Sequence, residues 1–140
     1  MLYSASRAQL VESVIKPALQ SGKLVVCDRF IDSTFAYQGV ARGLGADKID
    51  MLNKMACSDI MPDLTVFLDL SPRLAFARKG GADTSDRLEQ EGDNFHQKVY
   101  DGYLQACELY PDRIARVDCS GDAVTTHSKI VELLRQRGIV

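Results

Sequence analysis

Features that would point to a nucleic-acid or membrane partner are missing from this 140-residue sequence. Seventeen Lys and Arg residues stand against 19 Asp and Glu residues, and no basic run occurs. Nucleic acid is therefore not an expected partner. No apolar stretch reaches the length of a membrane span, and the first residues have neither the charged head nor the apolar body of a signal peptide. We expect a cytoplasmic protein without a membrane partner.

A cysteine motif for zinc or for redox chemistry is missing as well. Cys27, Cys57, Cys107 and Cys119 are widely spaced, and no Cys-x-x-Cys pair occurs. Cys27 and Cys119 lie inside apolar, strand-like runs. The cysteines are therefore predicted to be buried, reduced thiols.

The sequence has the composition of one globular domain, with 46% apolar and 26% charged residues. Its apolar residues alternate between two patterns. Short runs predict strands at 24–28, 64–70 and 114–119, and helical spacing predicts helices at about 2–21, 31–38, 47–58, 72–79, 88–109 and beyond 120. Such alternation predicts an α/β fold in which helical crossovers join parallel strands.

The first strand-like run ends in an acid and an arginine. The apolar residues Leu24–Cys27 predict a strand covered on both faces, and Asp28 and Arg29 follow directly. Ligands of open parallel sheets bind at the carboxyl ends of strands. The arginine fork suits phosphate, and the acid can orient that fork or hold the water shell of a metal. Phosphate chemistry and an ion pair on an inert scaffold both fit this dipeptide.

Four blocks of the sequence together resemble the bacterial thymidylate kinase family. They are residues 2–10 (LYSASRAQL), 26–30 (VCDRF) with 33–39 (STFAYQG), 62–70 (PDLTVFLDL) and 86–89 (DRLE). Their order and spacing match the family from residue 2 almost to the end. The resemblance implies a three-layer αβα sandwich of the P-loop NTPase, nucleoside monophosphate kinase type. It also implies phosphoryl transfer from ATP to dTMP, giving dTDP, with Mg²⁺ on the ATP phosphates.

The resemblance assigns a base and sugar pocket to the first two blocks. It implies that Tyr3 stacks on thymine and that Arg7 hydrogen-bonds the thymine edge, and their spacing puts both on one helix face. The full set of implied substrate-binding residues is Tyr3, Arg7, Ser33, Thr34, Tyr37 and Gln38. A solvent-facing arginine over a core tyrosine is the alternative for the first pair. A water-facing helix surface is the alternative for Tyr37 and Gln38.

Phosphate binding is implied for the dipeptide after the first run. The resemblance gives Arg29 the clamp on the phosphates, and it gives Asp28 the placement of the monophosphate and of magnesium. The loop after the last strand is implied to help build the adenine pocket, through Asp118, Cys119 and Ser120.

A lid at about residues 78–91 is implied to close over ATP and to bring a basic group to the transferring phosphate. Such a group contributes roughly 10³ to 10⁵ in rate. Residues 80–85 read GGADTS, without an arginine, so Arg78, Lys79 and Arg87 are the candidates. A surface ion pair with a neighbouring acid fits Arg87 equally well.

The phosphate-binding loop of the family, Gly-x-x-x-x-Gly-Lys-Ser/Thr, does not occur in the sequence. We therefore expect residues 1–140 to be the C-terminal portion of a single, N-terminally incomplete domain that is inactive alone. In the family's strand order, 2-3-1-4-5, the absent first strand belongs between the strands at 24–28 and 64–70. Its absence is expected to leave two strand edges unpaired.

Two other functions remain open. A catalytically silent nucleotide-binding fragment would bind dTMP without releasing ADP. A kinase for another nucleoside or nucleoside monophosphate would keep the Asp-Arg pair and prefer a different base. A homodimer is also open, because members of the family are commonly dimers.

Overall fold

A computed structural model describes residues 2–58, 60–80 and 92–140, without the side chains of Lys79 and Asp93. Most of the described chain is helical. The helices are α1 (Leu2–Leu10), η1 (Val11–Ile15), α2 (Lys16–Gln20), α3 (Ile31–Thr34), η2 (Phe35–Ala41), α4 (Ala46–Cys57), α5 (Pro72–Lys79), α6 (Gly92–Leu109) and α7 (Ala123–Gln136), where η marks a π-helix. The strands are β1 (Thr65–Asp69) and β2 (Ile114–Asp118).

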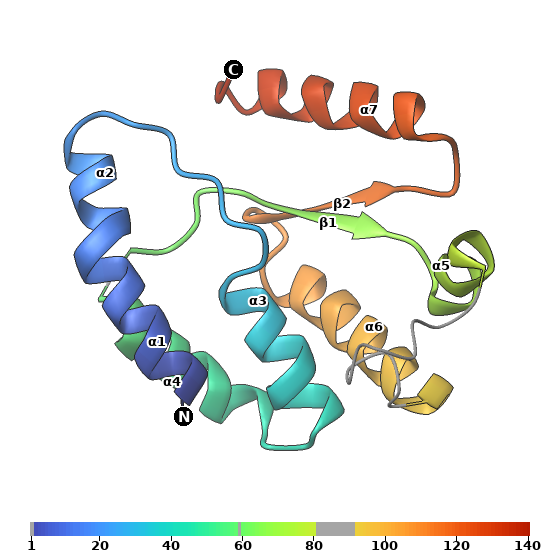
Figure 1. The fold of residues 1–140 in the computed structure, drawn as a ribbon, viewed down its shortest axis with the longest axis horizontal. Coiled ribbons are helices and arrows are strands. Elements are labelled where there is room, and N and C mark those ends of the chain that lie inside the picture. Colours follow the sequence, from blue (N-terminus) through green and yellow to red (C-terminus); the bar gives the residue numbers. More distant parts are fainter. Residues whose placement is uncertain (1, 59, 81–91) are drawn as a thin grey trace.

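The two strands form a parallel pair, with Thr65 opposite Ile114 and Asp69 opposite Asp118. Helix α7 lies on one side of this pair, and α3 and α6 lie on the other (Figure 1). The prediction of parallel strands between helices is confirmed for 64–70 and 114–119. The predicted helices at 31–38, 47–58 and 72–79 also agree with the structure to within a few residues.

The first predicted helix, 2–21, is present as the consecutive elements α1, η1 and α2. Its proline, Pro17, lies in the first turn of α2, where a backbone N–H is not needed for the helix. The turn before it is π-helical rather than kinked α-helix. Gly22 ends the helix with a φ of 75°, a conformation that glycine adopts without strain.

The predicted strand at 24–28 is wrong, because residues 23–27 form neither helix nor strand and belong to no sheet. Leu24 is 67% exposed and Val26 is 85% exposed, whereas Val25 between them packs on the helical core. The alternation is that of a strand with one covered face. A strand also needs a hydrogen-bonded neighbour, and within the described residues the sheet contains only β1 and β2.

The burial of the cysteines is confirmed in part. Cys57 and Cys119 are buried and Cys107 is half-buried, and all four thiols are free. The prediction is wrong for Cys27, which is exposed. Like Leu24 and Val26, Cys27 lies in a segment that no strand of the described residues covers.

Two apolar clusters form the core. The first joins the N-terminal helices to α4 through Val11, Ile15, Ile31 and Cys57. The second joins η2, α4, α6 and β2 through Phe35, Ile49, Ala106 and Ile114. Both clusters contain residues of α3 or η2 and of α4, so the helix that follows Arg29 is held from two sides.

A buried ion pair ties α3 to the sheet. Arg113 Nη2 lies 2.6 Å from Asp32 Oδ1, and Arg113 Nη1 lies 2.8 Å from Asp32 Oδ2, which also accepts a bond from Thr65 Oγ1. Burial disfavours the charge on Arg113, but the hydrogen bonds to Asp32 outweigh it and raise the pKa of Arg113. The ion pair therefore fixes the start of α3 beside the beginnings of both strands.

In the part of the chain that the structure describes, no helix combines the length and the apolar character that crossing a membrane requires.

Candidate functional site

Arg7 and Thr34, which the sequence places 27 residues apart, meet in the structure. The guanidinium Nη2 of Arg7 lies 2.5 Å from Thr34 Oγ1 and 3.4 Å from the carbonyl oxygen of Phe30. Nη1 donates to Asn53 Oδ1 over 3.0 Å. The guanidinium also lies over the Phe30 ring, 5.3 Å from its centroid. Helices α1, α3 and α4 thus meet around one half-buried cation.

Burial is the main influence on Arg7 and lowers its pKa, while the nearby Cys57 and Asp32 act in the opposite direction. One helical turn earlier, Tyr3 is 67% exposed. Arg7 is thus half-buried and Tyr3 is exposed. This excludes the alternative in which Arg7 faces solvent and Tyr3 lies in the core.

Arg29 has an unusual backbone conformation. Its φ of 64° lies in the left-handed region, which residues with a side chain rarely adopt. Both Arg29 and the preceding Asp28 are exposed. Burial raises the pKa of Tyr103 on α6, and the positive charge of Arg29 is among the weaker influences that lower it. Strained backbone of this kind is often found at functional sites.

Tyr103 joins two of the predicted substrate-binding residues. Its hydroxyl is 2.7 Å from Ser33 Oγ, and its ring stands edge-on to Tyr37 with centroids 6.5 Å apart. The same ring stacks on Phe67 of β1, with centroids 5.0 Å apart. Burial is the main cause that raises the pKa of Tyr103. Tyr37 is therefore half-buried against α6 rather than on a water-facing surface.

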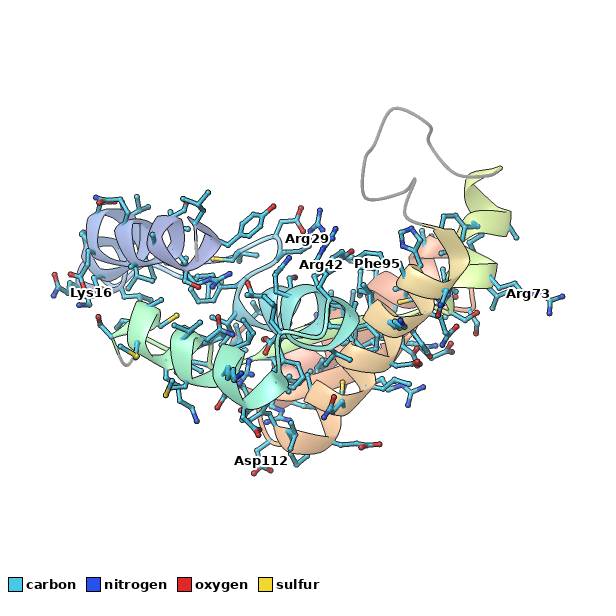
Figure 2. The ribbon with its side chains drawn as sticks, turned by 90° about the horizontal axis from the view of Figure 1, so that it is seen from below. Lys16, Arg29, Arg42, Arg73, Phe95 and Asp112 are labelled. Atoms are coloured by element: carbon cyan, nitrogen blue, oxygen red, sulfur yellow. The ribbon has the colours of Figure 1, made fainter. Side chains whose placement is uncertain are left out.

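Arg42 and Phe95 extend this group of rings. The guanidinium of Arg42 lies 5.1 Å from the centre of the Phe95 ring, and Phe95 stands edge-on to Tyr37 at 6.1 Å. Figure 2 shows Arg29, Arg42 and Phe95 on the same side of the molecule, with Arg29 and Arg42 nearest each other in that view. A cation on an aromatic face is stabilised by the ring quadrupole. The remaining predicted residue of this region, Gln38, follows Tyr37 in η2 and is half-buried.

Arg78 lies at the loop after β2. Its guanidinium donates to the carbonyl oxygens of Cys119, Ser120 and Gly121 over 2.8, 2.6 and 2.8 Å. The structure thus brings together Arg78, at the start of the predicted lid, and the loop of Asp118, Cys119 and Ser120, which is predicted to help build the adenine pocket. These three bonds tie the end of α5 to the loop that precedes α7.

The same loop is held from its other side by Asp118. Its carboxylate accepts bonds from the backbone N–H of Ser120 and from Lys129 Nζ, each over 2.9 Å. Hydrogen bonds from Ser120, followed by those from Lys129, hold the pKa of Asp118 well below its usual range. The carboxylate therefore stays ionised in neutral solution and shapes the loop through its own side chain.

The other lid candidates are not placed. Arg87 and most of the predicted lid lie outside the described residues, and the side chain of Lys79 is also outside them. Among the described residues, the candidate site consists of three groups of contacts, which are centred on Arg7, Tyr103 and Arg78.

Sequence reasoning missed Asn53, Tyr103, Arg42 and Phe95. One signal for Asn53 was available, because it lies between Ile49 and Cys57 at intervals of four residues and so falls on the buried face of α4. A polar residue on such a face needs a buried partner. The others depend on how α6 packs against η2, for which the sequence carries no comparable signal.

Comparison with known proteins identifies the family. The family description "Thymidylate kinase" matches residues 1–130. The thymidylate kinase of Thermoanaerobacter sp. strain X514 is 41% identical over 136 residues, which are 97% of this chain and 66% of that protein. That of Finegoldia magna is 42% identical over 140 residues, which are 100% of this chain and 68% of that protein.

A third relative, the thymidylate kinase of Lactobacillus delbrueckii subsp. bulgaricus, is 46% identical over 137 residues, covering 96% of this chain and 65% of its own length. The chain spans about two thirds of the length of the curated relatives it matches. The similarity extends through all the residues whose contacts are described above. The chain therefore belongs to the thymidylate kinase family.

Proposed function

We propose that this chain is part of an enzyme that transfers the γ-phosphoryl group of ATP to dTMP, giving dTDP for dTTP synthesis. The observation that carries the proposal is the family match over residues 1–130. Arg7 binds the thymine edge, Tyr3 stacks on the base, and Thr34 and Tyr37 line the base and sugar pocket with Ser33 and Gln38 beside them. The contacts between Arg7 and Thr34 support this assignment, because they join two of these residues from separate elements.

In this scheme Arg29 and Asp28 place the acceptor phosphate. Both side chains are exposed, and Arg29 has the left-handed backbone conformation that is often found at functional sites. A basic lid group, from Arg78, Lys79 or Arg87, stabilises the transferred charge. Arg78 donates to three carbonyl oxygens of the loop that follows β2, and these bonds favour a structural role for Arg78. In this role it shapes the loop of Asp118, Cys119 and Ser120, which helps to build the adenine pocket.

Magnesium enters this scheme with the nucleotide. The described residues contain no group of three or more His, Cys, Asp or Glu side chains that could hold a metal ion. The exposed carboxylate of Asp28 fits a Mg²⁺ ion that keeps waters and is bound chiefly by ATP phosphates. Such an ion, when bound, neutralises charge on the phosphates.

We also infer that the complete domain is a P-loop three-layer sandwich, of which residues 1–140 are the C-terminal portion. A further strand carrying the P-loop would lie between Leu24–Cys27 and β1. Three observations support it. Leu24 and Val26 are exposed, β1 pairs only with β2 among the described residues, and no P-loop sequence is present. Membership of this family also supports the proposal that the enzyme is cytoplasmic and forms a homodimer.

The test is to measure ADP release and nucleotide binding with dTMP, dUMP, dCMP and thymidine, using the full-length protein from its own gene and the 140-residue chain. We expect ADP release with dTMP from the full-length protein only. Binding of dTMP without ADP release by the full-length protein would favour a silent nucleotide-binding protein. Preference for another acceptor would favour a different kinase.

A matched pair of variants tests the phosphate clamp. Arg29→Gln is expected to weaken dTMP binding by about tenfold or more, the cost of one lost charge-assisted bond. Arg73→Gln is the control, because Figure 2 shows Arg73 at one end of the molecule, away from Arg29 near its middle. Equal effects of the two variants would contradict the role of Arg29.

A further inference from the structure

We propose that Asn53 is a positioning residue for base recognition, which fixes the guanidinium of Arg7 so that its unused N–H groups meet a carbonyl oxygen of the substrate base. This inference rests on the proposed function, and it concerns a residue on α4 that lies outside the four sequence blocks on which the family resemblance was based.

The contacts of Asn53 define its orientation. Its side chain is buried, with 3% exposure. Its Oδ1 accepts from Arg7 Nη1 over 3.0 Å, and its Nδ2 donates to the carbonyl oxygen of Ile31 over 3.1 Å. A guanidinium only donates and a backbone carbonyl only accepts, so the amide fits in one orientation alone. Asn53 therefore links Arg7 to the first turn of α3.

The remaining donors of Arg7 can be counted. A guanidinium carries five N–H groups. The contacts with Asn53, Thr34 and the Phe30 carbonyl use one on Nη1 and two on Nη2. The Nε–H and the second N–H of Nη1 are not used by these bonds. The group is thus fixed on its α3 and α4 side, with two donors left for a ligand.

The chemistry of an amide suits this task better than that of a carboxylate. An aspartate at position 53 would neutralise the arginine and would place a negative oxygen opposite the Ile31 carbonyl. Asn53 instead accepts a hydrogen bond and adds no charge, so Arg7 keeps its full positive charge for the ligand. The pair of bonds also restrains a long side chain that would otherwise lose rotamer freedom on binding.

The consequence is a preference among bases. A fixed pair of N–H donors favours a base with a carbonyl oxygen at the recognised edge, as in thymine. It disfavours a base with an amino group there, as in cytosine, because two donors would then face each other. When Arg7 is not held, the donors can turn away and the penalty for the amino group falls. Asn53 would therefore act on the ratio of the affinities for dTMP and dCMP.

The experiment compares three variants of the full-length protein. Asn53→Leu removes both bonds at nearly constant volume, and Asn53→Asp keeps an acceptor for Arg7. Tyr110→Phe is the control, because it removes a bond of similar burial, from Tyr110 to Asp50 Oδ1 over 2.6 Å, outside the site. Dissociation constants for dTMP and dCMP are measured by calorimetry. The ¹⁵N relaxation of Arg7 Nε, without nucleotide, reports how firmly its side chain is held.

We expect Asn53→Leu to weaken dTMP binding about tenfold, to change dCMP binding by no more than about twofold, and to increase the mobility of Arg7 Nε. Asn53→Asp should keep Arg7 Nε ordered, and its ratio of dTMP to dCMP affinity should be closer to that of the wild type than the ratio of Asn53→Leu. Tyr110→Phe should leave the ratio unchanged, because a loss of stability alone acts on both nucleotides equally.

The outcomes separate the two ideas. A wild-type protein that does not bind dTMP overturns the proposed function and this inference with it. Binding of dTMP by the wild type with an unchanged dTMP to dCMP ratio in Asn53→Leu overturns the role of Asn53 alone. If Asn53→Leu does not fold, a mobile Arg7 Nε in Asn53→Asp overturns it, and an ordered one supports it.

Discussion

At the scale of single residues, the buried charges of this chain are held by several partners each. Asp32 binds Arg113 through both oxygens, and the two side chains are only 8% and 15% exposed. Because an isolated buried charge is costly, each partner depends on the other. The exposed pair of Lys16 and Glu12 on the N-terminal helix has no such dependence.

Replacing one partner of the buried pair is expected to be severe. Asp32→Leu should lower the free energy of unfolding by about 3–5 kcal/mol, because it leaves Arg113 buried without its carboxylate. The double variant Asp32→Leu/Arg113→Met should recover most of that loss. Urea unfolding measures both, and Glu12→Gln, expected to cost about 1 kcal/mol or less, is the control. A loss of only about 1 kcal/mol or less in Asp32→Leu would show that Arg113 does not depend on this carboxylate.

The same residues show what sequence alone can predict about the site. Arg7 and Thr34 were expected in one pocket because of the family resemblance, and they are in contact. The contacts of Asn53 and Tyr103 were not expected, because they arise where α4 and α6 pack against α3 and η2. Residues far apart in the chain become neighbours through packing of whole elements, and a single sequence shows this only where a polar residue interrupts an apolar face.

At the scale of elements, helix α6 comes unusually close to η2. A Cβ atom added at Gly102 would lie 2.9 Å from Ala36 Cα and 3.1 Å from the carbonyl oxygen of Ala36. Backbone atoms cannot move aside as side chains do. The absence of a side chain at position 102 therefore sets the distance between the helix that carries Tyr103 and the one that carries Tyr37.

Gly102→Ala should accordingly destabilise the protein by about 1–3 kcal/mol through overpacking. Gly121→Ala is the matched control, because its added Cβ would meet only Thr125, at an ordinary 3.7 Å, and should change stability by about 0.5 kcal/mol or less. Thermal unfolding of the two variants beside the wild type tests this. Equal melting temperatures for both would show that the two helices can separate without cost.

Helix α7 begins at a capping carboxylate whose effect depends on pH. Asp122 Oδ1 accepts from Thr125 N over 2.7 Å, and this bond lowers the pKa of Asp122 below its ordinary 3.8. A carboxyl whose pKa is lowered in the folded state stabilises it above the unfolded pKa, and the stabilisation is lost as the pH falls through the folded value.

Asp122→Ala should therefore melt at a lower temperature than the wild type near pH 6, and the difference should shrink near pH 2.5. Asp122→Asn, which caps the helix without titrating, should melt closer to the wild type than Asp122→Ala near pH 6, and its difference from the wild type should fall by a similar amount as the pH is lowered. Circular dichroism melts at the two pH values provide the comparison. A constant difference between wild type and Asp122→Ala would show that the charge of Asp122 has no part in capping.

At the scale of the whole molecule, the sheet formed by the described residues has fewer strands than the sequence pattern predicts. Helix positions were predicted within a few residues because helical hydrogen bonds are local. The strands at 64–70 and 114–119 were predicted correctly because each has the other as a partner. The segment Leu24–Cys27 has the same apolar pattern but no neighbour among the described residues. Periodicity predicts which segments are able to form strands, whereas the neighbour decides whether they do.

Exposed apolar residues on a segment outside any helix or sheet, such as Leu24 and Val26, favour association between chains. The 140-residue chain alone is expected to self-associate, and Leu24→Lys/Val26→Lys should reduce that association. Met51→Lys/Met55→Lys is the control, because these residues are similarly exposed, at 58% and 70%, but lie on a helix. Sedimentation velocity over a range of concentrations measures the effect. A larger reduction by the methionine pair would assign the association to α4 instead.

The π-helical turn at Val11–Ile15 has a consequence for how this protein can change over evolutionary time. A π turn contains one residue more than an α turn. Because both kinds of turn complete one revolution, removing a single residue there would restore a regular α-helix and leave the preceding segment facing the same way. A one-residue deletion within a regular α-helix would instead rotate that segment by about 100° about the helix axis. Arg7 would therefore still face its partners on α3 and α4 after a deletion at the π turn. The N-terminal helix can thus lose one residue at this turn without reorienting this arginine.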